Sequence, residues 1–359
     1  MKVKSFDYIT FIIMLFLAGC GLLFIFSSTY TCAKPFSLFF IKQTIGIVCG
    51  IIIYFLCLIP DYRTIIRWGY TAYFGIIAIL LLTLIKGSIG MGAKRWINLF
   101  FFKLQPSELI KFCLPAYITN SLYMQKKIVI HSFHLFIPIV TLLGLTFILI
   151  LKQPDLGTAL LILFSGLLIC WLAGLDKKFF LYSLLIVFIM APLIWSFVLR
   201  DYQKNRIIVF FGQGNHQKEG YQIEQASIAI GSGGLWGKGL FKGTQNKLRF
   251  LPESRTDFIF AVLCEEWGLV GAIMIIASYI MLFLRSFYLI SQLKDIYAQL
   301  FASGLIIHII LAALINIGMV LSMLPIVGIP LPLMSYGLSN LWITMICLGS
   351  FQNIIIQCR

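Results

Sequence analysis

Acidic and basic side chains stand at the ends of long apolar runs in this 359-residue chain. Asp257 lies in the segment FLPESRTDFIF (250–260), two residues after Arg255 and directly before an apolar run. A carboxylate that is partly desolvated yet close to a cation can serve as a general base. The same position also suits the N-cap of a helix beginning at Phe258, so the spacing leaves both roles open.

Glu108 and Lys111 stand in the segment QPSELIK (105–111), which predicts the start of a helix with proline at its first position. Residues three apart share a helix face, so the two charges are expected side by side just inside an apolar run. Ionisable groups at such depth usually face a polar cavity, which favours a role in binding. The alternative is a self-neutralised pair that joins two helices.

Arg95 and Asp155 belong to two short segments between apolar runs, GAKRWIN (92–98) and KQPDLGT (152–158). The arginine fork suits phosphate oxygens, although Trp96 beside it could make the first segment an interfacial anchor. Asp155 is a candidate for substrate binding or for the N-cap of the helix that follows. Gly157 is expected to permit the close approach of another helix.

A glycine-rich, basic segment spans residues 200–256 and contains AIGSGGLWGKG (229–239). Its glycines match neither GxGxxG nor GxxxxGK[ST], so nucleotide binding is not supported. Backbone N–H groups beside Lys238 could still cradle phosphate. Arg206 and Lys247 are the candidate phosphate-binding cations of this segment.

Three prolines lie close together in the segment SMLPIVGIPLPLMSYG (322–337). They are expected to end the preceding span and to force an irregular, re-entrant loop. Irregular backbone at membrane depth is tolerated where it lines a polar cavity. This loop should therefore help to wall the site, with Ser335 as a candidate substrate ligand.

The composition is that of a membrane protein: 60% of the residues are hydrophobic, 11% are charged, and the mean hydropathy is +0.97. Soluble chains carry roughly a quarter charged residues. We predict an all-α integral membrane protein, a single polytopic domain over residues 1–359. Residues 200–256 would form one long extracytoplasmic loop between spans seven and eight. The expected spans, about ten by the length of their apolar runs, are residues 7–28, 41–59, 69–85, 106–124, 135–151, 156–174, 179–199, 257–284, 297–321 and 334–355.

The distribution of lysine and arginine gives conflicting signals about orientation. Compact pairs close to span ends, such as Lys126–Lys127 and Lys177–Lys178, favour cytoplasmic termini. Counting every loop would favour the opposite orientation, but the positive-inside rule discounts long loops. If both termini are cytoplasmic, more lysine and arginine residues lie on the extracytoplasmic side than the rule predicts. An anionic ligand bound at that face would explain this excess.

The segments, in this order, resemble the SEDS family of RodA, FtsW and SpoVE proteins over nearly the whole chain. The matching motifs are GAKRWI, QPSELIK, QPDLGTA, AIGSGG, FLPESRTDFIFA and GIPLPLMSYG. The very short N-terminus and the runs GTQNKLRFLPE and LPIVGIPLP are more similar to RodA than to FtsW. Two positions depart from the family pattern: Leu338 replaces a glycine of SYGGS, and Ser322 stands where glycine is common.

The resemblance implies a peptidoglycan glycosyltransferase of the bacterial inner membrane that polymerises lipid II during cell elongation. It places the essential acid at Asp257 and the charged pair of its QPSELxK motif at Glu108 and Lys111. We expect Asp257 to deprotonate the 4-hydroxyl of the acceptor sugar, which attacks the donor's anomeric carbon with inversion. Cations of the outer face would stabilise the departing pyrophosphate, chiefly Lys111, Arg95, Arg206 and Lys247.

No cofactor is evident in the sequence. Cysteine and histidine lack metal-ligand spacing and no cage of carboxylates is visible, although a divalent cation could help to neutralise pyrophosphate. The chain has no transpeptidase motif, and the resemblance implies a class B penicillin-binding protein as crosslinking partner, together with other membrane proteins of the elongation complex. A nucleic-acid partner is not expected.

Two other functions remain open. A flippase for lipid-linked precursors would need polar residues along a path through the membrane, whereas the candidate residues gather at one face. A non-catalytic scaffold of the wall-elongation complex would not need Asp257.

Overall fold

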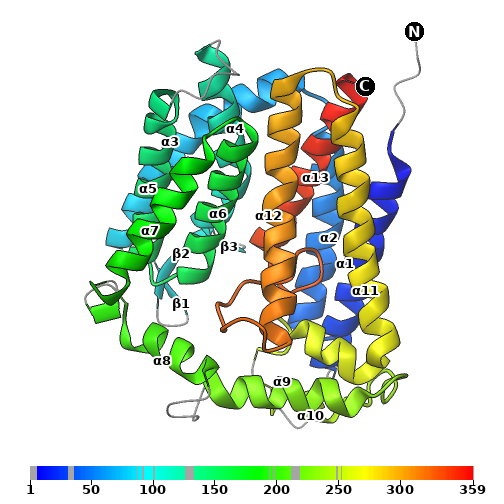
Figure 1. Ribbon diagram of the computed structural model, residues 1–359. Helices are drawn as coiled ribbons and strands as arrows, with labels where there is room; N and C mark the ends of the chain where they lie inside the picture. Colours follow the sequence, from blue (N-terminus) through cyan, green and yellow to red (C-terminus); the bar gives the residue numbers. More distant parts are fainter. Residues whose placement is uncertain are drawn as a thin grey trace.

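The computed structural model describes residues 6–30, 36–86, 88–90, 93–99, 102–125, 133–193, 195–196, 199–211, 219–247, 250–251 and 253–358. Each predicted span coincides with a helix, and these helices run alongside one another as a bundle (Figure 1). They are α1 (Tyr8–Thr29), α2 (Leu38–Leu56), α3 (Tyr62–Lys86), α4 (Pro106–Met124), α5 (Ile137–Lys152), α6 (Leu156–Leu172), α7 (Lys177–Leu193), α11 (Ile259–Ser291), α12 (Ile296–Val320) and α13 (Leu338–Cys358).

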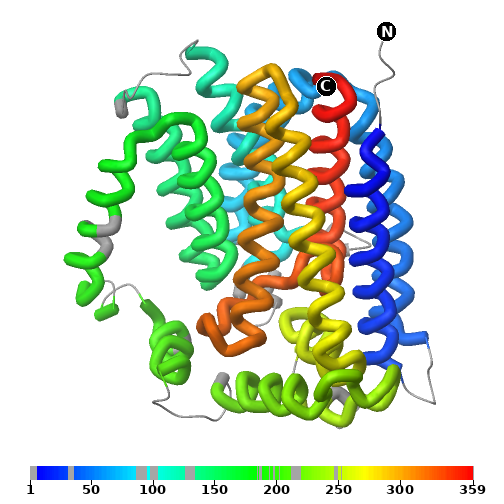
Figure 2. Tube along the Cα trace, turned by 45° about the vertical axis from the view of Figure 1, so that its right-hand side comes forward, coloured from blue at the N-terminus to red at the C-terminus, as the bar shows by residue number. Residues whose placement is uncertain are grey.

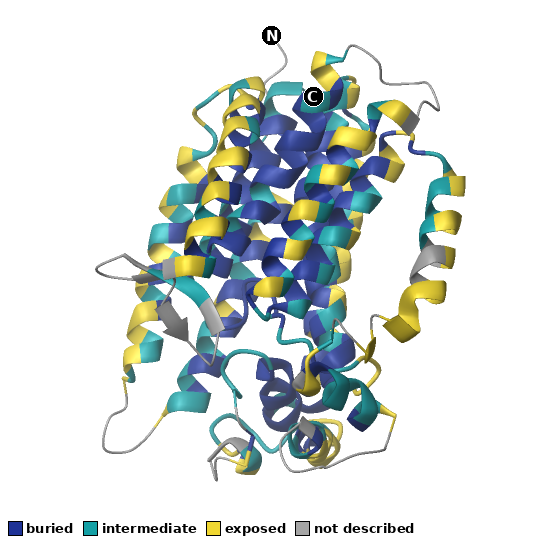
Figure 3. Cartoon of the chain, turned by 90° about the vertical axis from the view of Figure 1, so that its left-hand side faces the viewer, coloured by how far each residue is buried: buried dark blue, intermediate teal, exposed yellow. Residues whose placement is uncertain are grey.

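The predicted class, a helical multi-pass membrane protein, is confirmed. Six of the described helices, α1 to α3 and α11 to α13, are long and apolar enough to cross a bilayer. The helices α5 and α6 are apolar but shorter, so ten crossings stay a prediction. Figure 3 shows exposed residues along the outward faces of the bundle, and large apolar side chains are exposed there on α1, α2, α3, α7 and α11. A bilayer would cover such a surface with lipid, because lipid tails are as apolar as these side chains.

Polar residues at the helix ends explain where several spans begin. Asp7, Ser37 and Asp155 cap α1, α2 and α6, since each side chain accepts a hydrogen bond from a backbone N–H in the first turn. Such a cap satisfies one of the N–H groups that the first turn leaves without a helical partner. The N-cap predicted for Asp155 is therefore confirmed.

The two ends of the bundle differ. The helix α1 begins and α13 ends at one end, whereas α8 (Asp201–Phe210), α9 (Glu219–Gly233) and α10 (Thr244–Lys247) lie across the other (Figures 1 and 2). We call this second end the loop face. The segment 200–256 is thus largely helical where it is described, and its place outside the membrane stays a prediction.

A small sheet is the part of the fold that an all-α prediction missed. The strands β1 (Ser88–Gly90), β2 (Ala93–Leu99) and β3 (Phe102–Leu104) form an antiparallel ribbon between α3 and α4. Ser88 pairs with Trp96, and Ile97 pairs with Leu104. The ribbon satisfies the backbone of this connection without a helix, and it carries Arg95 on its middle strand.

The glycine-rich run packs against α11 rather than offering its backbone to a ligand. The N–H groups of Lys238 and Gly239 donate to the carbonyl oxygens of Glu265 and Glu266, each at 3.0 Å. A Cβ on Gly237 would lie 2.1 Å from the Glu266 carbonyl oxygen. The hypothesis that these N–H groups cradle phosphate is therefore wrong, because the protein backbone already uses them.

The two departures from the family pattern have local consequences. Leu338 begins α13, and its side chain packs so closely on Gly46 of α2 that a Cβ there would lie 2.4 Å from a Leu338 methyl carbon. Ser322 adopts φ 60°, in the left-handed region that favours glycine. The glycine common at that position is thus explained by backbone conformation, and Ser322 bears the strain instead.

Candidate active site

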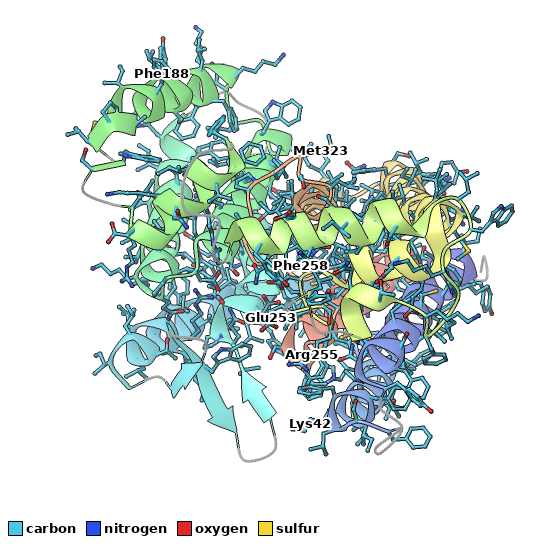
Figure 4. The ribbon with its side chains drawn as sticks, turned by 90° about the horizontal axis from the view of Figure 1, so that it is seen from below. Lys42, Phe188, Glu253, Arg255, Phe258 and Met323 are labelled. Atoms are coloured by element: carbon cyan, nitrogen blue, oxygen red, sulfur yellow. The ribbon has the colours of Figure 1, made fainter. Side chains whose placement is uncertain are left out.

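Asp257 lies on the loop face, in a tight turn that precedes α11. The N–H groups of Thr256 and Phe258 both donate to the carbonyl oxygen of Glu253, at 3.1 and 3.3 Å. Glu253 itself is in the left-handed region, with φ 54°. Figure 4 shows Glu253, Arg255 and Phe258 close together near the centre of the loop face.

The backbone of this turn is held by hydrogen bonds from two other parts of the chain. The carbonyl oxygens of Arg255, Thr256 and Asp257 each accept one hydrogen bond. The donors, in the same order, are the N–H of Tyr336 (2.9 Å), the hydroxyl of Ser335 and the side-chain amide of Asn316 (2.9 Å). Three successive anchored carbonyls fix the direction in which the Asp257 side chain leaves the backbone.

Ser335 and Asn316 also tie this turn to the loop at residues 321–337. The Ser335 hydroxyl accepts from the N–H of Leu331 at 2.8 Å, and the Asn316 amide donates to the carbonyl of Ile329 at 2.7 Å. Both side chains are buried. Ser335 therefore connects the loop to the Asp257 turn, and its contact with substrate stays a prediction.

The environment of the Asp257 carboxyl favours its protonated form. Burial raises its pKa to about 6; the charge of Glu253 raises the pKa as well, Arg206 opposes the rise, and Asp155 adds to it. A carboxyl with such a pKa is largely ionised at neutral pH, yet it is a stronger base than an ordinary aspartate.

The N-cap role considered for Asp257 is wrong. The N-cap position of α11 is Phe258, and among the described residues no side chain caps this helix. The carboxylate is left to face its charged neighbours. One of them, Glu253, was not among the predicted site residues, although a second carboxylate only four positions before Asp257 in the sequence was a signal that could have found it.

Arg206 approaches Asp257 from α8. Its Nη1 donates to the carbonyl oxygen of Ile326 at 3.1 Å, which docks α8 on the 321–337 loop. Its charge is near enough to lower the pKa of Asp257. The structure thus brings this predicted cation to the predicted base, although fifty residues separate them in the sequence.

Arg95 and Asp155 form one unit beside this group. The guanidinium of Arg95 donates to the carbonyls of Gln153, at 2.8 Å, and Pro154, and it lies 3.6 Å from the Asp155 carboxylate. Asp155 also accepts from the Gln105 side chain at 2.9 Å. Arg95 therefore holds the turn before α6, and any contact with phosphate would have to come from its remaining donors.

Two glycines let the 321–337 loop reach the site. A Cβ on Gly157 would lie 2.4 Å from the carbonyl oxygen of Val327, so only glycine fits here, and the element that approaches it is this loop rather than the predicted helix. Gly328 has φ 72°, and a Cβ there would lie 3.5 Å from the Asp257 carboxylate. The prediction that this loop helps to wall the site is confirmed for the side that faces Asp257.

Glu108 and Lys111 share a face of α4, as predicted. The Lys111 ammonium lies 2.7 and 2.8 Å from the two oxygens of Glu108, and both side chains are buried. This geometry is that of the self-neutralised pair, and the charges that shift the pKa of Asp257 are others. The side chain of Lys247 lies outside the described part of the chain, so its predicted role is not tested.

A metal centre is not apparent in the described part of the chain. Among those residues, no group of three or more histidine, cysteine, aspartate or glutamate side chains lies close enough together to hold an ion.

The fold and the site together define a multi-pass helical membrane protein with a partly buried acid–base group at one end of its bundle. The chain belongs to the cell cycle protein family of FtsW, RodA and SpoVE, whose model matches residues 8–359. That match includes every predicted site residue.

Relatives of known name agree with this membership. The chain is 38% identical over 289 residues to the peptidoglycan glycosyltransferase MrdB of Escherichia coli K12, covering 80% of this chain and 78% of the relative. It is 31% identical over 426 residues to the peptidoglycan glycosyltransferase RodA of Treponema pallidum, covering 98% of each. The crystal structure of the rod shape determining protein RodA of Thermus thermophilus matches with a TM-score of 0.73 and 25% identity, over 98% of this chain and 97% of that one.

Proposed function

We propose that this protein is a peptidoglycan glycosyltransferase that polymerises lipid II into glycan strands during cell elongation. The observation that carries the proposal is Asp257, a partly buried carboxylate with a raised pKa, anchored through its backbone and set beside Arg206. The relatives named as peptidoglycan glycosyltransferases support the same activity. The loop face would lie outside the bacterial inner membrane, with both termini in the cytoplasm.

The chemistry follows from the position of the base. Asp257 accepts the proton of the acceptor's 4-hydroxyl while that oxygen attacks the anomeric carbon of the donor from the side opposite its pyrophosphate. The new glycosidic bond forms as the bond from the anomeric carbon to the pyrophosphate oxygen breaks, with inversion. The products are a longer glycan and a polyprenyl pyrophosphate, and Asp257 later returns its proton to water.

Cations must balance the negative charge that develops on the departing pyrophosphate. Arg206 is the best placed of the candidates, since its charge already acts on Asp257. Lys111 has three N–H donors, and the two contacts to Glu108 leave one for a phosphate oxygen. Arg95 and Lys247 remain further candidates, and we assign Asp155 to holding the turn before α6 beside the base.

A divalent cation stays a proposal. Glu253 and Asp257 are the neighbouring carboxylates that could hold one together with substrate phosphates, and a bound cation would neutralise part of the pyrophosphate charge. Because the described carboxylates form no cage, no step above depends on it. Polymerisation measured with added Mg²⁺ and after chelation would test the requirement.

The decisive experiment is polymerisation of lipid II by purified Asp257→Asn protein. A positioned base supplies about 10²–10⁴ in rate, so the variant should lose at least about 10²-fold while inserting in the membrane normally. Asp201→Asn is the matched control, because it removes an exposed carboxylate from α8 on the same face. Glycan synthesis by Asp257→Asn near the level of the unmodified protein would exclude the base role.

The same assay separates the alternatives. A flippase would move lipid-linked precursors between leaflets and make no polymer, and a scaffold would support wall synthesis in cells whether or not Asp257 is present.

Since a glycan polymerase makes uncrosslinked strands, we also propose a class B penicillin-binding protein as partner, together with other membrane proteins of the elongation complex. Co-purification of the two proteins from detergent-solubilised membranes would test that association.

A further inference from the structure

Arg255 presents its guanidinium on the loop face, stacked on an aromatic ring. Its central carbon lies 3.8 Å from the centroid of the Phe39 ring, a cation–π contact with α2. The Tyr336 ring meets the same phenylalanine edge to face, with centroids 5.2 Å apart. Among the described residues, no hydrogen bond or ion pair of the Arg255 side chain is recorded. Stacking on a ring face leaves the N–H edge of a guanidinium available for a ligand.

Lys42 is a second cation on the face of α2 that carries Phe39. Residues three apart on a helix lie on the same face, so Lys42 stands one turn from Phe39 along α2. The side chain of Lys42 is exposed, and no acid lies within ion-pair distance of it in the described part of the chain. In Figure 4 the side chains of Arg255 and Lys42 lie in line along the loop face, with Glu253 beyond Arg255.

This cationic pair is on the other side of the site from Arg206. Arg206 comes from α8, whereas Arg255 is packed on α2, and Figures 1 and 2 show these two helices on different sides of α12. The Asp257 turn lies between them, because it is bonded to α12 through Asn316. The base therefore has one group of cations on each side.

We infer that Arg255 and Lys42 form a second anion-binding subsite, which holds the pyrophosphate of the second lipid-linked substrate. This inference rests on the proposed function, since a polymerase that joins two polyprenyl-linked sugars must hold two pyrophosphates at once. Arg206 then serves the donor, whose pyrophosphate departs. Arg255 and Lys42 serve the acceptor, whose pyrophosphate stays attached while its distal sugar reaches Asp257.

The test is a binding measurement in which no reaction takes place. Asp257→Asn protein in phosphatidylcholine nanodiscs is titrated with undecaprenyl pyrophosphate, and the number of bound lipids per protein is measured. We expect two sites in this background. Adding Lys42→Gln and Arg255→Gln should weaken one of them by about 10- to 100-fold, the loss expected for charge-assisted hydrogen bonds.

Matched variants separate a specific site from general charge. Lys177→Gln with Lys178→Gln also removes two exposed positive charges, at the opposite end of the bundle, and should leave both sites intact. Lys42→Gln alone changes an exposed side chain, so a weakened site in this variant cannot be attributed to misfolding. Arg255→Lys should restore only part of the affinity, because lysine lacks the planar fork.

The outcomes are distinct. Two unchanged sites in the Lys42→Gln, Arg255→Gln protein would overturn the subsite. Inorganic pyrophosphate that binds there when undecaprenyl pyrophosphate does not would overturn its assignment to a lipid-linked ligand. If the unmodified protein made no polymer from lipid II while the loss of one binding site persisted, the proposed function would fail and the subsite would stand.

Discussion

Replacing Asp257 by asparagine should stabilise the folded protein even as it slows polymerisation. The environment raises the pKa of this carboxyl from 3.8 to about 6. The folded state therefore binds the proton more tightly than the unfolded state, and the ionised carboxylate lowers the stability of the fold. A shift of about two pKa units corresponds to about 3 kcal/mol at neutral pH. This is an upper limit, because the side chain is partly exposed and water screens its charge.

The sign of the effect gives it a pH dependence. Above about pH 6 the carboxylate is ionised in the folded state and the destabilisation is complete, whereas below the ordinary value near 4 it disappears. Asparagine, which carries no charge, should thus raise the midpoint of thermal unfolding at pH 7.5 and have little effect near pH 4. Tryptophan fluorescence of purified protein, heated at one fixed rate in detergent at several pH values, would measure the difference.

Asp155 provides the matched comparison, because it is a nearby carboxylate with the opposite role. It caps α6 and accepts hydrogen bonds from neighbouring groups, so Asp155→Ala should lower the midpoint; the lost cap alone costs about 1 kcal/mol. A midpoint for Asp257→Asn at pH 7.5 that equals or falls below that of the unmodified protein would refute the argument that burial disfavours the charged base.

Three further outcomes are expected. The rate of lipid II polymerisation should fall as the pH drops through about 6, because Asp257 must be ionised to accept a proton; a flat profile between pH 5 and 8 would contradict this. Glu108→Gln should cost about 3–5 kcal/mol of stability by leaving the Lys111 charge buried without its partner, and adding Lys111→Met should recover much of this loss. The midpoints of thermal unfolding of the single and double variants would measure both effects, and equal midpoints for these two variants would contradict a stabilising ion pair. Gly157→Ala should lower both stability and polymerisation, since its Cβ would collide with the 321–337 loop, whereas Gly144→Ala has open space around it and should be silent.

The positions of the helices could be read from the sequence because they depend on local properties. Apolar runs of sufficient length, with Asp7, Ser37 or Asp155 at their starts, specify where a membrane helix begins. The ribbon around Arg95 was missed because short strands need partners, and a sequence of seven residues does not reveal its pairing.

The candidate site was predicted in part. The motif around Asp257 and the cation Arg206 were identified from residue type and position, and the structure brings their charges together. Glu253 was overlooked because its proximity to Asp257 arises from one left-handed residue in a turn. The phosphate cradle proposed beside Lys238 was wrong because backbone N–H groups that are free in a glycine-rich sequence can be used by a neighbouring helix, here α11.

The sequence by itself determined that acidic and basic residues stand at one end of a set of apolar helices. It did so because helix length, capping and apolar pattern are encoded within about twenty consecutive residues. Only the tertiary structure decided which of those charges meet: Arg95 holds the turn at Asp155, Arg206 acts on Asp257, and Arg255 stacks on Phe39. These contacts join distant parts of the chain. Tertiary packing also buries the Asp257 carboxyl, and this burial is the largest cause of the rise in its pKa to about 6.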